Sequence, residues 1–147
     1  MKTVKNILLM LLIGLAVYFY VQQGERVPEA TEHRHEGINQ EILSAVHKRL
    51  SNVWVEGVGE VSRILSDDNY GDRHQRFILR LSPEHTVLIA HNIDIAPRIN
   101  KLKQGDRVEF YGEFEWNSKD GLVHWTHHDP NGSHEGGWLK HNGRIYK

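Results

Sequence analysis

The distribution of apolar residues divides the chain into three parts. An uncharged apolar run extends from Ile7 to Val21, a polar stretch without periodicity follows it, and the remainder alternates apolar and polar residues in short segments. An apolar run at the extreme N-terminus, preceded by Lys2 and Lys5, is typical of an export signal. The pattern predicts a signal-anchor at residues 1–22, a tether at residues 23–37 and one domain at residues 38–147.

The apolar run is expected to remain attached as a membrane anchor. No small-x-small cleavage site follows it, because the next residues are Gln22, Gln23, Gly24 and Glu25. The run is about 22 Å long as a helix, against a hydrocarbon core of about 30 Å, and snorkelling Lys5 with interfacial aromatic residues compensates for the difference. We therefore expect a single-pass protein of the bacterial inner membrane with its domain in the periplasm. Cleavage, giving a periplasmic or secreted protein, is the alternative.

The domain is predicted to be mainly β. Apolar residues spaced along one helical face predict a packing helix at Ile38–Leu50. Five short alternating segments then predict strands that begin at Val53, His74, Thr86, Asp106 and Gly121, with a second short helix at Ala96–Leu102. Five strands with this interruption match a small oligonucleotide- and oligosaccharide-binding (OB) barrel. Another small antiparallel barrel or a sandwich is the alternative.

Two further signals concern how the sheet bends and ends. Gly57, Gly59 and Gly112 interrupt alternating strands, as expected where a small barrel bends its sheet. Near the C-terminus, Asn142 and Gly143 separate two short runs in "WLKHNGRIY", which is a strong hairpin signal. We expect a C-terminal hairpin beside the barrel.

Composition restricts the chemistry. The 147 residues carry a net charge of -1, from 18 basic and 19 acidic residues, so no overall charge attracts nucleic acid. The chain has no cysteine, which excludes disulfides, thiolate metal sites and cysteine nucleophiles. Eleven histidines supply the remaining candidate chemistry, because histidine titrates near neutrality and is the commonest metal ligand.

The hairpin between the second and third strands brings distant polar residues together. If "SPEH" is its turn, Leu81 lies opposite Thr86, so that Arg76 faces His91 and Gln75 faces Asn92. Alternation then places His74, Arg76 and His91 on one face, and Phe77, Leu79 and Leu88 on the other. A one-residue slip changes the pairs, but in either register His74 and Gln75 meet His91 and Asn92 at the open end of the hairpin.

The fifth strand adds the histidines of "HWTHHDPNGSHEGGW". Alternation assigns Val123 and Trp125 to the core and His124, Thr126 and His128 to the opposite face, with His127 and Asp129 at the end of the strand. In an OB barrel the third strand pairs with the fifth. His91 and the fifth-strand histidines are therefore expected to approach one another.

Three chemistries fit this cluster. As a metal site, His127 and Asp129 with His91, His124 or His134 would hold zinc or a similar divalent ion, although Asp129 also suits the start of a "DPNG" turn. The first hypothesis is a phosphodiester hydrolase of the nuclease type, either metal-assisted or with two histidines. In the two-histidine form, His74 and His91 with His124 or His128 would divide acid and base roles while Arg76 holds the phosphate.

The third chemistry is binding without catalysis, with single-stranded nucleic acid, a metal ion or an envelope component as ligand. Here the ligand-binding candidates are Gln75, Asn92 and Trp138, the last of which we expect to cover the barrel mouth after the bend at Gly136 and Gly137.

At "HQRF", "AHNIDIAPRI" and "HWTHHDPNGSHEGGWLKHNG", the chain resembles an uncharacterised family of small bacterial envelope proteins, a domain of unknown function. The resemblance covers roughly residues 50 to 147. It implies that the OB-like domain is a unit of its own, to which the tether and anchor are additions, and it supplies no activity.

Overall fold

The computed structural model of the chain describes Ile13, Leu15 and residues 37–147. The predicted signal-anchor and tether therefore lie almost entirely outside the described residues. Within the described part of the chain, no helix is long and apolar enough to cross a membrane. The chain forms two compact units, the second of which extends from His35 to Lys147, and this second unit contains the predicted domain.

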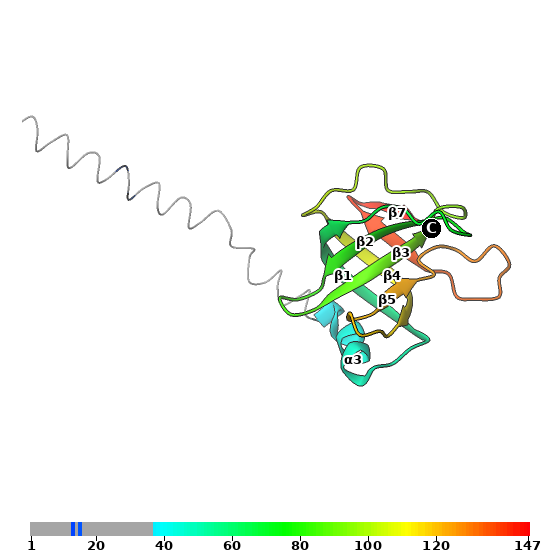
Figure 1. Cartoon of the computed structure of the whole chain (residues 1–147), viewed down its shortest axis with the longest axis horizontal. Coiled ribbons are helices and arrows are strands. Elements are labelled where there is room, and N and C mark those ends of the chain that lie inside the picture. The colour runs from blue at the N-terminus through cyan, green and yellow to red at the C-terminus, as the bar shows by residue number, and fades with distance from the viewer. Residues whose placement is uncertain (1–12, 14, 16–36) are drawn as a thin grey trace, which may run out of the picture. The chain divides into compact units, whose positions relative to one another are not determined.

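The domain is built on one continuous sheet (Figure 1). Its strands run in the spatial order β1-β2-β3-β5-β4-β6-β7, and β1 also pairs with β4, which closes the first five strands into a barrel. β3 and β5 are parallel and the other pairs are antiparallel. This is OB connectivity with an added hairpin, so the predicted fold is confirmed. The strands are β1 (Val53–Ile64), β2 (His74–Arg80), β3 (Thr86–Asn92), β4 (Arg107–Glu115), β5 (Leu122–His124), β6 (Trp138–His141) and β7 (Arg144–Tyr146).

Closure of the barrel depends on the bend in β1. This strand pairs with β4 through Val53–Glu60 and with β2 through Glu60–Ile64, so it must turn from one neighbour to the other. Gly57 lies against the Phe110 ring, and a Cβ atom at this position would come within 2.3 Å of the ring. The absence of a side chain at Gly57 therefore lets Phe110 fill the core at the bend.

The predicted first helix forms over a shorter range, as α3 (Gln40–Lys48). It packs Ile42, Ala45 and Val46 into the core. The helix ends because Arg49 adopts a left-handed conformation, and its backbone N–H bonds to the carbonyls of the last turn. Leu50, which the pattern placed on the helical face, consequently lies outside the helix and is 41% exposed.

Asn39 attaches α3 to the barrel. Its side chain is buried and does not cap the helix. Instead the amide nitrogen donates to the carbonyls of Val58 and Leu81, at 2.9 and 3.1 Å, and the amide oxygen accepts the Val58 N–H at 2.8 Å. One side chain thus satisfies three backbone groups on two segments of the barrel.

The second predicted helix, Ala96–Leu102, is wrong, because these residues form turns. The amide of Gln75 binds both backbone groups of Ile99, donating to its carbonyl at 3.0 Å and accepting its N–H at 2.9 Å. The carbonyl of Pro97 lies 3.3 Å from His91 Nε2. Side chains inside the barrel therefore bind the backbone groups that a helix would pair within itself.

The predicted β2–β3 register is wrong by one residue. Arg80 pairs with Thr86, because the Leu81 N–H donates to the His85 carbonyl and closes the turn over residues 82–84 instead of the four predicted residues 82–85. Gln75 consequently pairs with His91, and both side chains are buried. His74 and Arg76 lie on the outer face and do not share the face of His91. The expectation that His74 and Gln75 meet His91 and Asn92 at the open end of the hairpin is confirmed.

Replacing Asn39 tests its role as the attachment of α3. Asn39→Ala leaves three buried backbone groups without partners, so we expect the free energy of unfolding to fall by about 3 kcal/mol. Urea denaturation followed by circular dichroism measures this change. The exposed neighbour provides the control, and Gln40→Ala is expected to change stability by no more than about 0.5 kcal/mol. Equal effects of the two substitutions would contradict the assignment.

Candidate functional site: a histidine cluster at the end of the barrel

A loop leaves and re-enters the sheet along one edge of β4. Glu113 pairs with His124, the last residue of β5, and Tyr111 pairs with Trp138, the first residue of β6. Residues 125–137 therefore form an excursion whose two ends lie beside Gly112. A Cβ on Gly112 would come within 2.4 Å of the His124 carbonyl, and one on Gly137 within 2.1 Å of the Trp125 carbonyl. The two glycines allow the ends of the loop to approach each other.

Trp125 is not a core residue, so its predicted position is wrong. β5 ends at His124, and Trp125 has a φ of 51°, which reverses the alternation that the strand pattern assumed. Thr126 and His127 are buried in its place, and His128 is exposed. The left-handed conformation of a large side chain costs about 1–2 kcal/mol, and such strain is found most often at functional positions.

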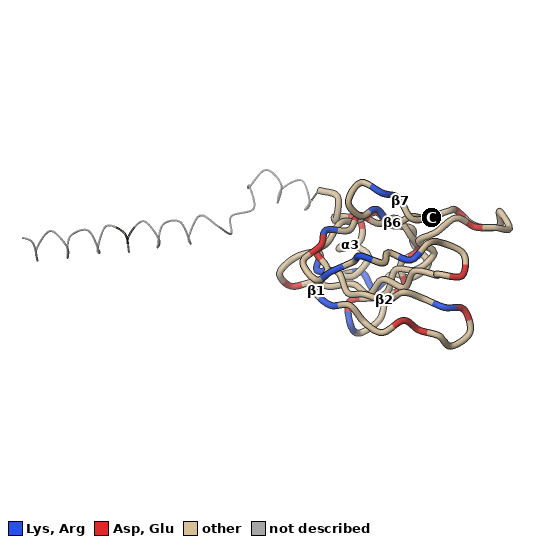
Figure 2. The backbone as a smooth tube through the Cα atoms, turned by 90° about the horizontal axis from the view of Figure 1, so that it is seen from above, with Lys and Arg blue, Asp and Glu red and all other residues tan. Residues whose placement is uncertain are grey.

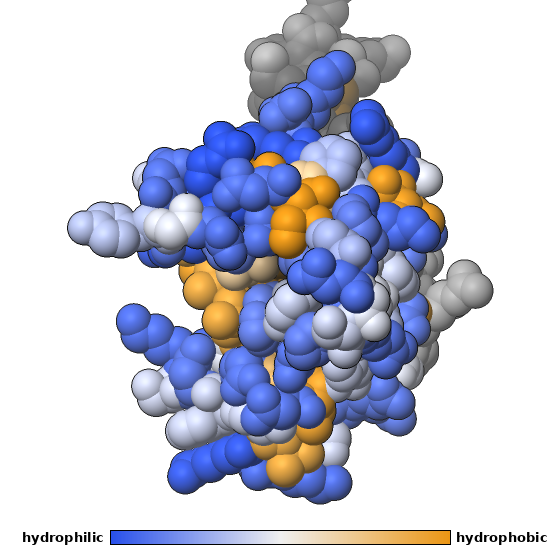
Figure 3. All heavy atoms as spheres, turned by 90° about the vertical axis from the view of Figure 1, so that its right-hand side faces the viewer, coloured by the Kyte–Doolittle hydropathy of each residue, from blue (hydrophilic) through white to orange (hydrophobic). Residues whose placement is uncertain are grey.

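The indole of Trp125 lies between two imidazoles. Its ring centroid is 5.4 Å from that of buried His127 and 4.5 Å from that of exposed His134. In Figure 1 the loop that carries these residues projects from the right side of the barrel. Figure 3 shows that side, whose surface is mostly hydrophilic with separate hydrophobic patches.

His91 is fully buried and both of its ring nitrogens have partners. Nε2–H donates to the Pro97 carbonyl at 3.3 Å, so Nδ1 accepts the hydroxyl of Thr126 at 2.9 Å. Burial lowers the pKa of His91 to about 4, against the raising effect of the Pro97 carbonyl, and nearby His127 and His74 lower it further. His91 is therefore neutral near pH 7, and it holds the 93–106 connection in place.

Gln75 and Asn92 also have structural partners. The Gln75 amide is bound to Ile99, and the Asn92 side-chain oxygen accepts the Asp94 N–H at 2.9 Å. Both residues are buried at the end of the β2–β3 hairpin. The structure thus brings the predicted ligand-binding pair to the site, but directs its hydrogen bonds to the backbone.

His74 and His124 lie half-buried on the outer face, on the two strands that flank β3. Strands separated by one neighbour lie about 10 Å apart. On β3, Ala90 lies beside His124 and pairs with Arg76, whereas His74 pairs with Asn92, two residues further along the hairpin. His74 donates Nδ1–H to the Asp72 carbonyl at 2.8 Å. The Nε2 atom of His124 is inaccessible to water and has no hydrogen-bond partner within the described residues.

The partial burial of His124 favours its neutral form. Desolvation lowers its pKa, the carboxylates of Glu113 and Glu115 oppose this, and the nearby imidazoles of His74 and His127 lower it again. The net direction is below the ordinary value. The histidine cluster, defined as His74, His91, His124 and His127, thus combines residues of β2, β3, β5 and the following loop. His128, which the sequence analysis included in the catalytic set, is exposed and lies outside this cluster.

The arginines at this end of the barrel have partners. Arg76 donates to the Ser66 carbonyl at 3.1 and 3.2 Å and lies 3.7 Å from Asp68. Arg73 pairs with Asp94 at 2.7 Å, and Arg98 pairs with Asp67 at 2.9 Å. Basic and acidic residues are interspersed over the whole domain (Figure 2). These arginines thus hold the loops on either side of β2 in place through hydrogen bonds and ion pairs.

Asp129 organises the exposed loop. Its carboxylate accepts the N–H groups of Asn131 at 2.9 Å, of His134 at 2.7 Å and of Ser133, and these bonds lower its pKa. His127 donates Nδ1–H to the His128 carbonyl at 2.7 Å. Among residues 37–147, no group of three or more histidines or carboxylates is arranged to hold a metal ion. The predicted set of His127, Asp129 and His134 does not converge as three ligands.

Two features were not anticipated from the sequence. Trp138 stacks against Tyr111 on the outside of the sheet, with ring centroids 6.5 Å apart, and does not cover the barrel mouth. His141 is buried and its Nε2 lies 2.8 Å from an oxygen of Asp106. Burial tends to raise the pKa of Asp106, but hydrogen bonds from the Lys103 N–H and His141 lower it overall. Asp106 and His141 are too far apart in the sequence for any spacing pattern to have predicted their contact.

The comparisons with known proteins give a family and no activity. The family model described as "Protein of unknown function (DUF3465)" matches residues 30–147. A comparison with curated proteins gave no match. The crystal structure of the S. pombe Stn1–Ten1 complex is similar at 15% identity and a TM-score of 0.38, covering 48% of this chain and 52% of that one. This chain thus spans about half of that protein, and the OB assignment rests on the strand pairing alone.

The buried state of His91 predicts a pH dependence of stability. Its folded pKa of about 4 lies below the ordinary 6.5, so the unfolded chain binds a proton first as the pH falls. The contribution of neutral His91 to the free energy of unfolding is fully present above pH 6.5. It declines towards pH 4, by about 3 kcal/mol in total. We expect His91→Gln to be less stable than the wild type at pH 7 and to lose less stability than the wild type between pH 7 and 4.5.

Urea titrations at several pH values measure this difference in slope. His128→Gln is the control, because His128 is exposed on the loop of residues 125–137 and its substitution should leave the slope unchanged. Parallel pH profiles for the wild type and His91→Gln would show that His91 is not held neutral by the fold.

Proposed function

The chain belongs to the DUF3465 family, whose function is unknown, and we propose that its OB barrel is a non-catalytic binding module. The ligand site is the outer face of β2, β3 and β5 beside the loop of residues 125–137. The ligand is an uncharged molecule rich in hydroxyl groups, of which an oligosaccharide is the representative class.

The unpartnered Nε2 atom of His124 carries this proposal. A buried polar atom without a hydrogen bond is destabilising by about 1–3 kcal/mol, so a ligand that supplies the partner would relieve this cost. Because the atom is inaccessible to water, the side chains that cover it must move when the ligand binds. The free ring nitrogen of His74 lies on the same face, on β2 opposite Asn92. Two imidazole nitrogens that accept or donate hydrogen bonds suit hydroxyl groups.

Trp125 supplies the apolar part of the site. Its strained backbone turns the indole away from the core and towards the loop surface. His134 covers one face of the indole but is itself exposed. A ligand ring that displaces His134 would stack on Trp125, and aromatic rings of this kind bind flat, weakly polar surfaces.

Charge separates this ligand class from a phosphodiester. The nearby arginines are paired with aspartates or bound to a backbone carbonyl, His91 is neutral, and Glu113 and Glu115 lie close to His124. A phosphodiester needs a positive partner to compensate for its charge. The surroundings therefore favour binding of an uncharged ligand over the hydrolase and nucleic-acid hypotheses.

Phosphodiester hydrolysis remains the second candidate because one observation favours it. The pKa of His124 is lowered, so that its imidazole is neutral and able to accept a proton from an attacking water. His74, which is bound to the Asp72 carbonyl through Nδ1, would give its Nε2 proton to the leaving oxygen when protonated. His91 is not included in this pair because its two nitrogens are occupied.

We also propose that residues 1–22 tether this module to the bacterial inner membrane, with the domain in the periplasm. The proposal rests on the apolar run and its flanking lysines. The mass of the protein recovered from membranes distinguishes a retained anchor from a cleaved signal.

Titration of the purified full chain tests the binding function. We expect saturable changes in tryptophan fluorescence with at least one of chitohexaose, cellohexaose and maltohexaose. His124→Leu removes the hydrogen bond to the ligand and should weaken binding about tenfold. His85→Leu is the matched control, because His85 also has a buried ring nitrogen without a hydrogen bond, but lies on the β2–β3 turn.

The same samples separate the two candidates. Binding of a dT12 oligonucleotide without binding of any sugar, or equal losses in the His124 and His85 variants, would contradict the proposed ligand class. Turnover of a chromogenic phosphodiester that both His74→Ala and His124→Ala abolish would replace it with the hydrolase.

A further inference from the structure

Three aromatic side chains form a row across the outer face of β1, β4 and β6. The ring centroids of Trp54 and Tyr111 are 5.3 Å apart, and those of Tyr111 and Trp138 are 6.5 Å apart in a stacked arrangement. Each of the three residues is half-buried, so one part of each ring faces solvent. On β4, Glu113 pairs with Trp54 of this aromatic row (Trp54, Tyr111 and Trp138) and with His124, so the row adjoins the His124 end of the proposed ligand site.

Three carboxylates from three different elements lie near the row: Glu135 bonds to Tyr111, Glu56 pairs with Tyr111 across β1 and β4, and Glu41 lines the same groove as Trp54. The Tyr111 hydroxyl donates to Glu135 at 2.5 Å, and Glu135 belongs to the loop of residues 125–137. The pKa of Tyr111 is raised to about 12, first by this hydrogen bond, then by burial, and then by the negative charges of Glu135, of Glu41 on α3 and of Glu56 on β1. All three glutamates are exposed.

The negative charge at this place is not balanced by the domain itself. Within residues 37–147, none of these three glutamates has a basic side chain within 4 Å, whereas Glu109 on the same face pairs with Lys140 at 3.1 Å. The described carboxylates also form no group that would hold a metal ion. Charge complementarity therefore points to an organic cation and not to a divalent metal.

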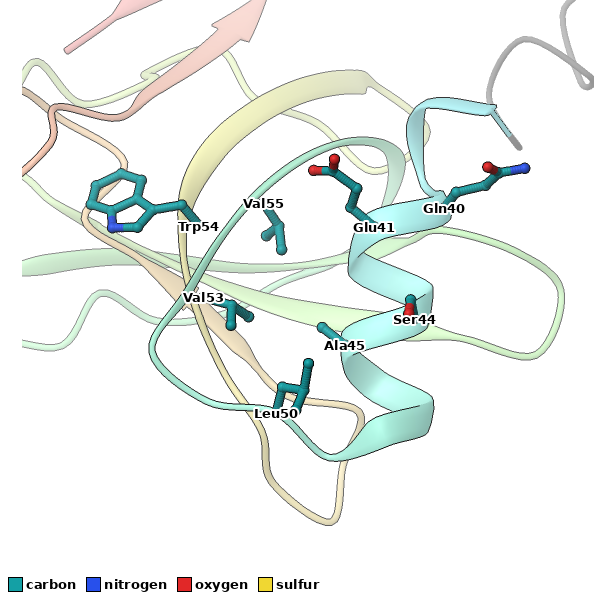
Figure 4. Close-up of a pocket in the computed structure, with 8 residues that line it drawn as sticks. All are labelled: Gln40, Glu41, Ser44, Ala45, Leu50, Val53, Trp54 and Val55. Atoms are coloured by element: carbon teal, nitrogen blue, oxygen red, sulfur yellow. The ribbon is translucent and has the colours of Figure 1, made fainter.

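An apolar groove adjoins the aromatic row. It has a volume of about 400 Å³ and lies between α3 and the start of β1 (Figure 4). Its floor is apolar, with Ala45, Val53 and the 41% exposed Leu50, and Gln40 and Ser44 lie along the helix side. Trp54 points away from α3 in Figure 4. Trp54 belongs to the row and also lines the groove, together with Glu41, so the two features are continuous.

We propose that the aromatic row and the groove dock an extended peptide segment of a partner protein that carries lysine or arginine side chains. A cationic side chain lies against the rings, where cation–π attraction and the carboxylates of Glu41, Glu56 and Glu135 act together. A neighbouring apolar side chain of the segment enters the groove beside Leu50. Trp138, predicted from the sequence as a ligand-binding residue, then contributes through this surface.

Peptides of opposite charge test the proposal on the full-length protein. We expect a fluorescently labelled (Gly-Lys)6 peptide to bind, with anisotropy falling as salt rises from 20 to 200 mM, and (Gly-Glu)6 and (Gly-Gln)6 not to bind. The double variant Glu56→Gln and Glu135→Gln keeps the shape of both side chains and should weaken binding about tenfold. Tyr111→Leu removes the central ring and should weaken binding about fivefold.

The control variant removes the same number of negative charges, but at positions away from the aromatic row. Asp72→Asn with Glu84→Gln alters two exposed carboxylates on other loops and should leave the affinity unchanged. Equal weakening in this control would show that only net charge matters and would overturn the proposal. Binding of (Gly-Gln)6 with similar affinity, or no binding of (Gly-Lys)6 at millimolar concentration, would also overturn it.

Discussion

The hydrogen bonds from Gln75 and His91 to the 93–106 connection determine how this end of the barrel is built. Both side chains point into the barrel, and together they bind the backbone of Pro97 and Ile99. A connection of this kind buries peptide groups that are costly to leave unpaired. Because interior amide and imidazole groups satisfy them, the connection needs no helix of its own, and Ile99 can enter the core.

This arrangement assigns different roles to residues of the same type. His91 is neutral and fixed between Pro97 and Thr126, so the chain after β5 is held against it. His74 and His124, on the outer face, keep ring nitrogens that the described residues do not bind. The loop of residues 125–137 then leaves the sheet between them and the aromatic row. One buried histidine thus positions the surface on which the proposed ligand binds.

The strands, their order and the terminal hairpin were predictable because alternation and turn residues are local signals. For the site, the sequence predicted which strands and residues come close together, but not which way their side chains face. Whether His91 faces inwards depends on one residue in the β2–β3 turn, and the bond between Leu81 and His85 decides it. The position of Trp125 depends on a left-handed residue at the end of β5, and no residue type announces such a conformation at tryptophan. The carboxylates around Tyr111 come from distant segments, so their convergence has no sequence pattern.

Long-range ¹H–¹⁵N correlation spectra of the histidine side chains test this division of roles most directly. The account predicts that His91 shows the neutral Nε2–H tautomer and does not titrate between pH 5 and 8. It also predicts that addition of a bound oligosaccharide shifts the ring nitrogens of His124 and His74 and leaves those of His91 unchanged. A His91 imidazole that titrates near pH 6.5, or that responds to the ligand more strongly than His124, would contradict the account.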